Sequence, residues 1–109
     1  MFITRSARKK IITWPLSEVL EQTIQRRILK NLKSRGIFAI KVIHANKNGC
    51  PDILACHNGA FIGIEVKTST GVVSPVQAAQ LKYIEAAGGV ALVARCWEDV
   101  KELLDGKNV

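Results

Sequence analysis

The chain has 109 residues and 48% hydrophobic content, enough for one ordinary hydrophobic core, which predicts a single domain over residues 1–109. Its formal net charge of +7 favours a polyanionic partner such as nucleic acid. No apolar run approaches the roughly 20 residues of a membrane span and no signal-peptide pattern is present, so we expect a cytoplasmic protein that has no membrane partner.

A long helix followed by a strand is expected in the first part of the chain. Pro15 and Ser17 indicate the start of the helix, with Ser17 as its N-cap, and Gly36 is typical of a helix C-terminus. The segment Ile37–Ile43 is apolar and rich in β-branched residues, which favours a strand. Residues 1–14, before the helix, are predicted to form a basic arm or to include a short strand.

A β-hairpin is the strongest local prediction. Asn58-Gly59 lies between two β-prone runs, Asp52–His57 and Ala60–Lys67, and this dipeptide is typical of a two-residue turn. Counting outwards from the turn predicts which residues face each other across the two strands. The predicted pairs are His57 with Ala60, Cys56 with Phe61, Leu54 with Gly63, and Asp52 with Glu65.

The remaining chain predicts a helix, a strand and a second helix. Ser74-Pro75 is typical of a helix N-cap followed by a proline at the first helical position, and Gly88-Gly89 ends that helix. Val90–Ala94 is expected to be a strand, and Trp97–Leu104 a short amphipathic helix. The predicted order αβββαβα indicates an α/β (α+β) fold with a central four-stranded mixed sheet flanked by helices.

Two acidic residues and a lysine are expected on one face of the hairpin. Asp52 and Glu65, if opposite each other, have Cβ atoms roughly 5 Å apart, where like charges repel. Alternation along the strand places Lys67 on the same face. A solvated outer face on which Glu65 and Lys67 offset each other is the alternative, but it leaves the repulsion unexplained. The arrangement suits a bound divalent cation and suggests a metal-dependent nuclease.

Two further polar residues lie on faces that should point toward the sheet. Glu21 falls within the apolar sector of the first helix, where it either faces the site or extends to water. Gln77 fits a capping box with Ser74, and it also shares a helix face with apolar residues that should meet the sheet. It can serve one of these roles or both.

Four short motifs together resemble a known nuclease family. They are Glu21–Gln25, Gly49–Asp52, Ile64–Thr68 and Ser74–Gln77. In this order they are similar to the VRR-NUC family, a branch of the nucleases named for a Pro-Asp…(Asp/Glu)-x-Lys motif, PD-(D/E)XK. The resemblance implies a restriction-endonuclease-like core and a structure-selective endodeoxyribonuclease that cuts branched DNA such as Holliday junctions. Without extra domains the chain resembles the stand-alone viral and phage members, and the likeness implies a homodimer.

The same resemblance implies a role for each motif residue. Asp52, Glu65 and the backbone carbonyl of Val66 would bind Mg²⁺ or Mn²⁺, hard ions that prefer oxygen ligands. Lys67 would assist the attacking water or stabilise charge on the phosphate. Gln77 would position the lysine or the water. Glu21 would act at or near the metal.

Basic residues outside these motifs are candidates for contact with the DNA backbone. They are Arg5, Arg8, Lys9, Lys10, Lys41 and Lys47. Two alternatives to a structure-selective nuclease remain open from the sequence: a non-catalytic basic DNA-binding module, and a sequence-specific restriction-like endonuclease.

Overall fold

The central sheet has four strands in the order β1-β2-β3-β4. In the computed structural model, which describes residues 16–106, three strands form an antiparallel meander: β1 (Phe38–Lys41), β2 (Ile53–His57) and β3 (Ala60–Val66). The fourth strand, β4 (Val90–Ala94), pairs parallel with β3, so the sheet is mixed as predicted.

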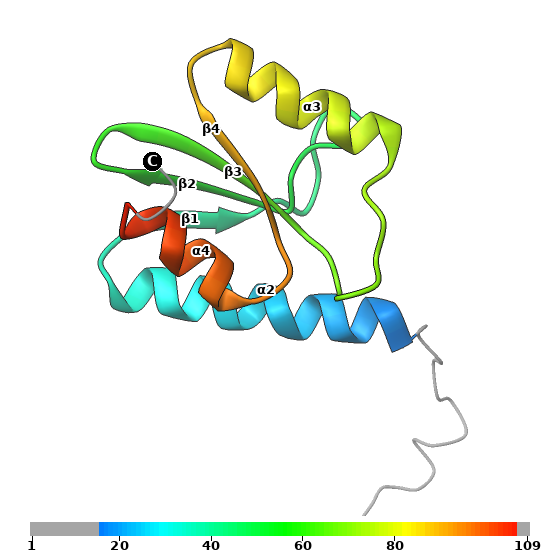
Figure 1. Ribbon diagram of the computed structural model, residues 1–109, viewed down its shortest axis with the longest axis horizontal. Coiled ribbons are helices and arrows are strands. Elements are labelled where there is room, and N and C mark those ends of the chain that lie inside the picture. The colour runs from blue at the N-terminus through cyan, green and yellow to red at the C-terminus, as the bar shows by residue number, and fades with distance from the viewer. Residues whose placement is uncertain (1–15, 107–109) are drawn as a thin grey trace, which may run out of the picture.

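The helices cover both faces of this sheet (Figure 1). α2 (Leu16–Ser34) and α4 (Trp97–Leu104) lie on one face, and α3 (Pro75–Ala86) lies on the other. The element order αβββαβα and the restriction-endonuclease-like α+β class are therefore confirmed.

The apolar core lies between the sheet and the α2–α4 layer. Ile28 and Leu32 of α2 are fully buried, and they belong to one cluster with Trp97 and Val100 of α4. The sheet contributes alternate residues of its two central strands to the same cluster. These are Ile53, Ala55, Ile62, Ile64 and Val66. Burial of this cluster holds β2 and β3 in one register, because a shift by one residue would turn their apolar side chains to the opposite face.

The hairpin has the predicted register. Asn58 and Gly59 have φ angles of 52° and 81°, the left-handed backbone that the favoured two-residue turn requires at both positions. His57 faces Ala60 and Leu54 faces Gly63, as counted from the sequence. The ladder stops one pair short of Asp52, which lies just before β2 rather than in it, and β3 ends at Val66 rather than Lys67.

Other predicted boundaries need correction. α2 begins at Leu16, so Ser17 is its second residue and not its N-cap. Helix starts are weakly specified because the first backbone N–H groups have no intrahelical partner. β1 is shorter than the predicted segment because its one partner within residues 16–106, β2, begins at Ile53, opposite Lys41. Beyond that pair, the Val42 N–H donates to the Asp52 carbonyl at 2.8 Å and holds the start of β2.

The face of β3 that carries Gly63 and Glu65 is covered by α3 and is not a solvated outer face. A Cβ atom on Gly63 would lie 2.6 Å from the Ile84 Cδ1 atom of α3 and 3.1 Å from the Pro51 Cγ atom. Glycine at this position therefore allows α3 to pack closely on the sheet. Glu65, two residues along the same face, is only 2% exposed, so the solvated-face alternative is wrong.

Candidate active site

The carboxylates of Asp52 and Glu65 meet where β2 begins and β3 ends. The Val66 N–H donates a 2.8 Å hydrogen bond to Asp52 Oδ2, which fixes the Asp52 side chain against β3 next to Glu65. Burial, and after it the nearby charge of Asp52, raise the pKa of Glu65 above its ordinary value. The hairpin thus brings these two acids together, as the residue count predicted.

Glu65 is buried and only partly satisfied by the surrounding protein. Its Oε2 atom accepts a hydrogen bond from Gln77 Nε2 at 2.9 Å and lies 3.8 Å from Lys67 Nζ. Its Oε1 atom is buried and has no hydrogen-bond partner. Burial is the largest cause of the raised Glu65 pKa, which reaches about 8, and the charges of Asp52 and Glu21 raise it further while Lys67 lowers it.

Gln77 performs both of the roles that the sequence left open. Its Oε1 atom accepts from the Ser74 N–H at 2.9 Å, and the Ser74 hydroxyl accepts from the Gln77 N–H at 3.1 Å, so the capping box is complete. The same side chain donates through Nε2 to Glu65. The cap therefore orients the amide group that holds the buried carboxylate.

The second face of the site comes from α2. Glu21 is partly buried, and its negative charge, after burial and the charge of Asp52, also raises the pKa of Glu65. Glu21 also lines a cavity of about 200 Å³ together with Glu18, Gln22, Gln25 and Lys41.

Sequence reasoning missed two residues near this site. Arg95 follows β4, and its Nη1 donates to the carbonyls of Thr68 and Gly71 at 2.6 and 2.8 Å, which secures the loop directly after Lys67. The parallel pairing of β3 and β4 would have placed Arg95 at this edge. Gln25 is 7% exposed, with a buried Oε1 that has no partner; its position one helical turn after Glu21 was the available signal.

Known proteins share both the sequence pattern and the fold. The family model described as archaeal Holliday junction resolvase (Hjc) matches residues 21–104. This range covers most of the chain, including all five candidate catalytic side chains. The chain belongs to the archaeal Holliday junction resolvase family. Because resolvases of this family are nucleases, this resolvase-family protein is a nuclease.

Solved structures share the fold. A VRR_NUC domain is similar with a TM-score of 0.69 and 20% identity, covering 80% of this chain and 96% of that one. A second VRR_NUC domain protein has a TM-score of 0.64 and 18% identity, with 78% and 84% covered. The Archaeoglobus fulgidus Hjc, a Holliday junction resolvase, has a TM-score of 0.53 and 30% identity, with 67% and 65% covered. The search of curated proteins finds no match.

The site of this resolvase-family nuclease fits a hard divalent cation. Two carboxylates meet there, and the orphaned Glu65 Oε1 atom is a buried acceptor that lacks a positive partner. Within residues 16–106 no group of three or more His, Cys, Asp or Glu side chains is arranged to hold a metal. The ligands that Asp52 and Glu65 offer are carboxylate oxygens, which suit a hard divalent cation with several retained waters better than zinc.

The basic residues proposed to contact DNA lie in different surroundings. Lys41 is exposed at the end of β1 and lines the cavity that contains Glu21. Lys47 is exposed and lies 5.8 Å from the centre of the Tyr83 ring. The other four, Arg5, Arg8, Lys9 and Lys10, lie outside the described residues.

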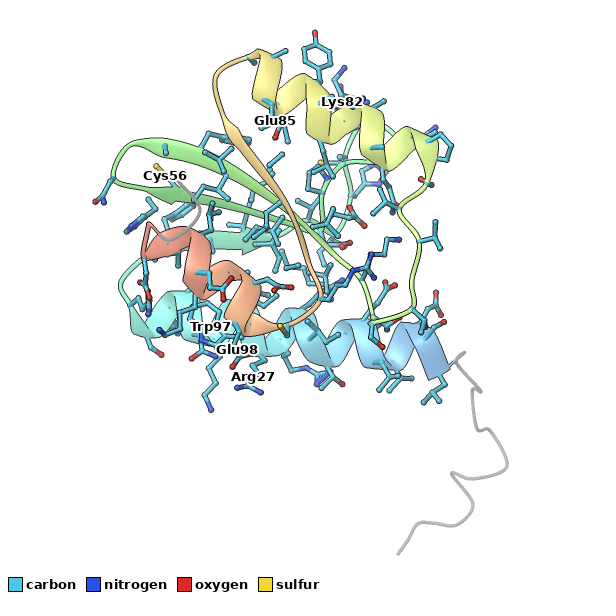
Figure 2. All side chains as sticks on the ribbon, viewed as in Figure 1. Arg27, Cys56, Lys82, Glu85, Trp97 and Glu98 are labelled. Atoms are coloured by element: carbon cyan, nitrogen blue, oxygen red, sulfur yellow. The ribbon has the colours of Figure 1, made fainter. Side chains whose placement is uncertain are left out.

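Two arginines, Arg27 of α2 and Arg35 directly after it, pair within the protein instead. Arg27 and Glu98 lie together on the outer side of α2 and α4, 3.5 Å apart (Figure 2). Arg35 pairs with Asp105 at 3.0 Å and lies 5.4 Å from the centre of the Trp97 ring. These contacts connect α2 to α4.

Among the helices of residues 16–106, none is both long and apolar enough to cross a membrane.

The raised pKa of Glu65 predicts how stability depends on pH in the absence of a cation. With a pKa of about 8 in the folded protein and 4.5 ordinarily, Glu65 holds its proton more tightly in the folded state between these pH values. The free energy of unfolding that this group contributes therefore falls as pH rises from about 5 to about 8.

A Glu65→Gln variant isolates this contribution. We expect the unfolding free energy of the wild type, minus that of the variant, to decrease from pH 5 to pH 9 in urea titrations with EDTA. The difference is the quantity to follow, because other carboxyl groups titrate in both proteins. A difference that is constant over this range would show that Glu65 is ionised throughout.

Proposed function

We propose that this resolvase-family protein is a divalent-cation-dependent, structure-selective endonuclease that hydrolyses phosphodiester bonds in branched DNA such as four-way junctions. The observation that carries the proposal is the pairing of a partly buried Asp52 with a buried Glu65, in which one oxygen of Glu65 lacks any partner. Such a pair is unfavourable in an isolated protein and becomes favourable when a cation lies between the acids.

Each residue has a separate role in this proposal. Asp52, Glu65 and the backbone carbonyl of Val66 hold Mg²⁺ or Mn²⁺. When bound, the ion lowers the pKa of a water and neutralises charge that develops on the phosphate. Lys67, which is largely buried beside Glu65, places a fixed positive charge near the developing negative charge. Glu21 contributes further negative charge at the α2 side of the site.

Substrate contacts are proposed for the basic surface. Lys41 and Lys47 are exposed and can bind phosphate without reading sequence, together with the basic residues Arg5, Arg8, Lys9 and Lys10 near the N-terminus. Binding should then weaken steeply as salt concentration rises.

We also propose a homodimer, because a four-way junction has two equivalent strands to cut and one chain carries one site. A stand-alone viral or phage origin stays a prediction from the sequence.

A panel of labelled DNAs tests the proposed function. Purified protein is incubated with Mg²⁺, Mn²⁺ or EDTA and with linear duplex, flapped, forked and four-way substrates of unrelated sequences. We expect cation-dependent cuts in the branched DNAs and at most slow cutting of linear duplex. Binding without cutting under every condition would favour a non-catalytic module, and cuts that follow one sequence in linear duplex would indicate a restriction-like enzyme.

A Gln77→Glu variant separates the two roles of Gln77. The new side chain still accepts from the Ser74 N–H, so the capping box and the thermal stability of α3 should be largely retained. It replaces the amide donor at Glu65 with a second carboxylate, which removes the hydrogen bond that orients Glu65. We expect single-turnover cleavage to fall by about 10- to 100-fold, as for other outer-shell partners of metal ligands. Unchanged cleavage would limit Gln77 to the helix cap.

A further inference from the structure

Within residues 16–106, two buried side-chain acceptors lack a hydrogen-bond partner, and they are Glu65 Oε1 and Gln25 Oε1. Buried polar atoms are nearly always paired in folded proteins, so each such atom calls for an explanation. The cation of the proposed function explains the Glu65 atom. It leaves the Gln25 atom unexplained, because a ligand role for Gln25 is not part of that proposal.

The position of Gln25 connects it to the same site. Gln25 follows Glu21 by four residues on α2, so the two side chains lie on one helix face, about 6 Å apart along the axis. Both line one cavity of about 200 Å³ with Lys41, and Lys41 pairs across the sheet with Ile53, the residue directly after Asp52. The Glu21 charge also affects the Glu65 pKa. Gln25 therefore lines a cavity that borders the start of β2, next to Asp52.

The chemistry of an amide oxygen indicates what it can bind there. It accepts a hydrogen bond and carries no net charge, so it adds no fourth negative charge to those of Asp52, Glu65 and Glu21. A hard divalent ion held by two carboxylates keeps several waters, and these waters are strong hydrogen-bond donors. A hydrated cation therefore supplies a positive partner for Glu65 Oε1 and a proton donor for Gln25 Oε1 at the same time.

We propose that Gln25 is a positioning residue for the hydrated cation, whose Oε1 atom accepts a hydrogen bond from a water of the hydration shell. This inference rests on the proposed function, since it requires a cation at Asp52 and Glu65. It assigns Gln25 a role in the affinity and placement of the ion and not in the stability of the ion-free protein.

Gln25→Met tests the role of the acceptor, because methionine has a similar length and no amide oxygen. A polar core residue that merely stabilises the fold would give a lower melting temperature in EDTA and an unchanged Kd for Mg²⁺. The proposal predicts the opposite pattern. The melting temperature in EDTA is unchanged or higher, because an unpaired acceptor is removed, and the Kd for Mg²⁺ from calorimetry rises about 10-fold.

Two further variants make the test specific. Gln22→Met is the matched control: Gln22 is the same residue type and lines the same cavity but is exposed, so neither quantity should change. Gln25→Glu keeps an acceptor, so it should lower the melting temperature in EDTA through repulsion and bind Mg²⁺ at least as tightly as the wild type. An equal loss of affinity in Gln25→Glu and Gln25→Met would overturn the proposal.

The wild-type titration separates failure of this inference from failure of the proposed function. If the wild type binds neither Mg²⁺ nor Mn²⁺, the cation-dependent function and the role of Gln25 both fail. If the wild type binds the ions and Gln25→Met binds them equally well, only the role of Gln25 is overturned.

Discussion

Replacing Asp52 with asparagine should reduce single-turnover cleavage of a four-way junction by about 10³-fold or more while the protein stays folded. Asparagine can still accept the Val66 N–H that Asp52 Oδ2 accepts at 2.8 Å, so the start of β2 keeps its anchor. It removes one of two charges that hold the cation. A metal ion supplies several kcal/mol of transition-state stabilisation, and each 1.36 kcal/mol is about a factor of ten in rate.

A variant with the same change of charge controls for altered DNA binding. Glu102→Gln also removes one negative charge, from an exposed position on α4, and it should cleave at the wild-type rate. Junction binding, measured in Ca²⁺ or EDTA by gel shift, should be no weaker in Asp52→Asn than in the control. If Asp52→Asn cleaves the junction at a rate within about tenfold of the control, Asp52 is not a ligand of the metal.

The largest stability loss is expected for Gly49→Ala. Gly49 has a φ of +79°, and an added Cβ atom would lie 2.6 Å from Val76 Cγ1, 2.8 Å from the Val76 carbonyl oxygen and 2.9 Å from its carbonyl carbon. The backbone of α3 cannot move aside as a flexible side chain does. Left-handed backbone costs alanine about 1–2 kcal/mol and overpacking about 1–3 kcal/mol, so we expect a total of roughly 2–5 kcal/mol in urea unfolding.

Gly36→Ala separates the two costs. Gly36 has a similar φ of +72°, but nothing lies within 4 Å of an added Cβ atom. It should lose only the backbone contribution of about 1–2 kcal/mol. Gly49→Ala should also slow cleavage, because Gly49 lies three residues before Asp52 and packs against the turn of α3 that carries Gln77. Equal losses of stability in the two variants would show that α3 is not in tight contact with residue 49.

Local sequence signals predicted the parts of the fold that depend on a few adjacent residues. The hairpin register followed from the backbone demands of Asn58 and Gly59, and the cap of α3 followed from Ser74 and Gln77. The first turn of α2 was predicted less well. Leu20 is apolar and yet 45% exposed, because the helix pattern alone does not reveal where the partner surface ends.

The environment of the site depends on long-range packing, which the sequence does not display. That Glu65 is buried follows from α3 covering the Gly63 face of the sheet, which is a contact between distant segments. The unpaired Gln25 oxygen was equally hidden, since the sequence indicates a helix face but not the partners of its polar atoms. Asp52, Glu65 and Lys67 could be predicted as neighbours because strand pairing places them locally, whereas the contact of Gln77 with Glu65 depends on α3 packing on the sheet.

Anomalous diffraction from a crystal containing Mn²⁺ tests the central claim most directly. Asp52 and Glu65 are held by β2 and β3 so that their carboxylates can share one ion, and the account predicts an anomalous peak within about 2.5 Å of an oxygen of each. If the crystal is saturated with Mn²⁺ and the anomalous peak is absent between these two side chains, or lies only at another place, the claim that Asp52 and Glu65 share one ion is contradicted.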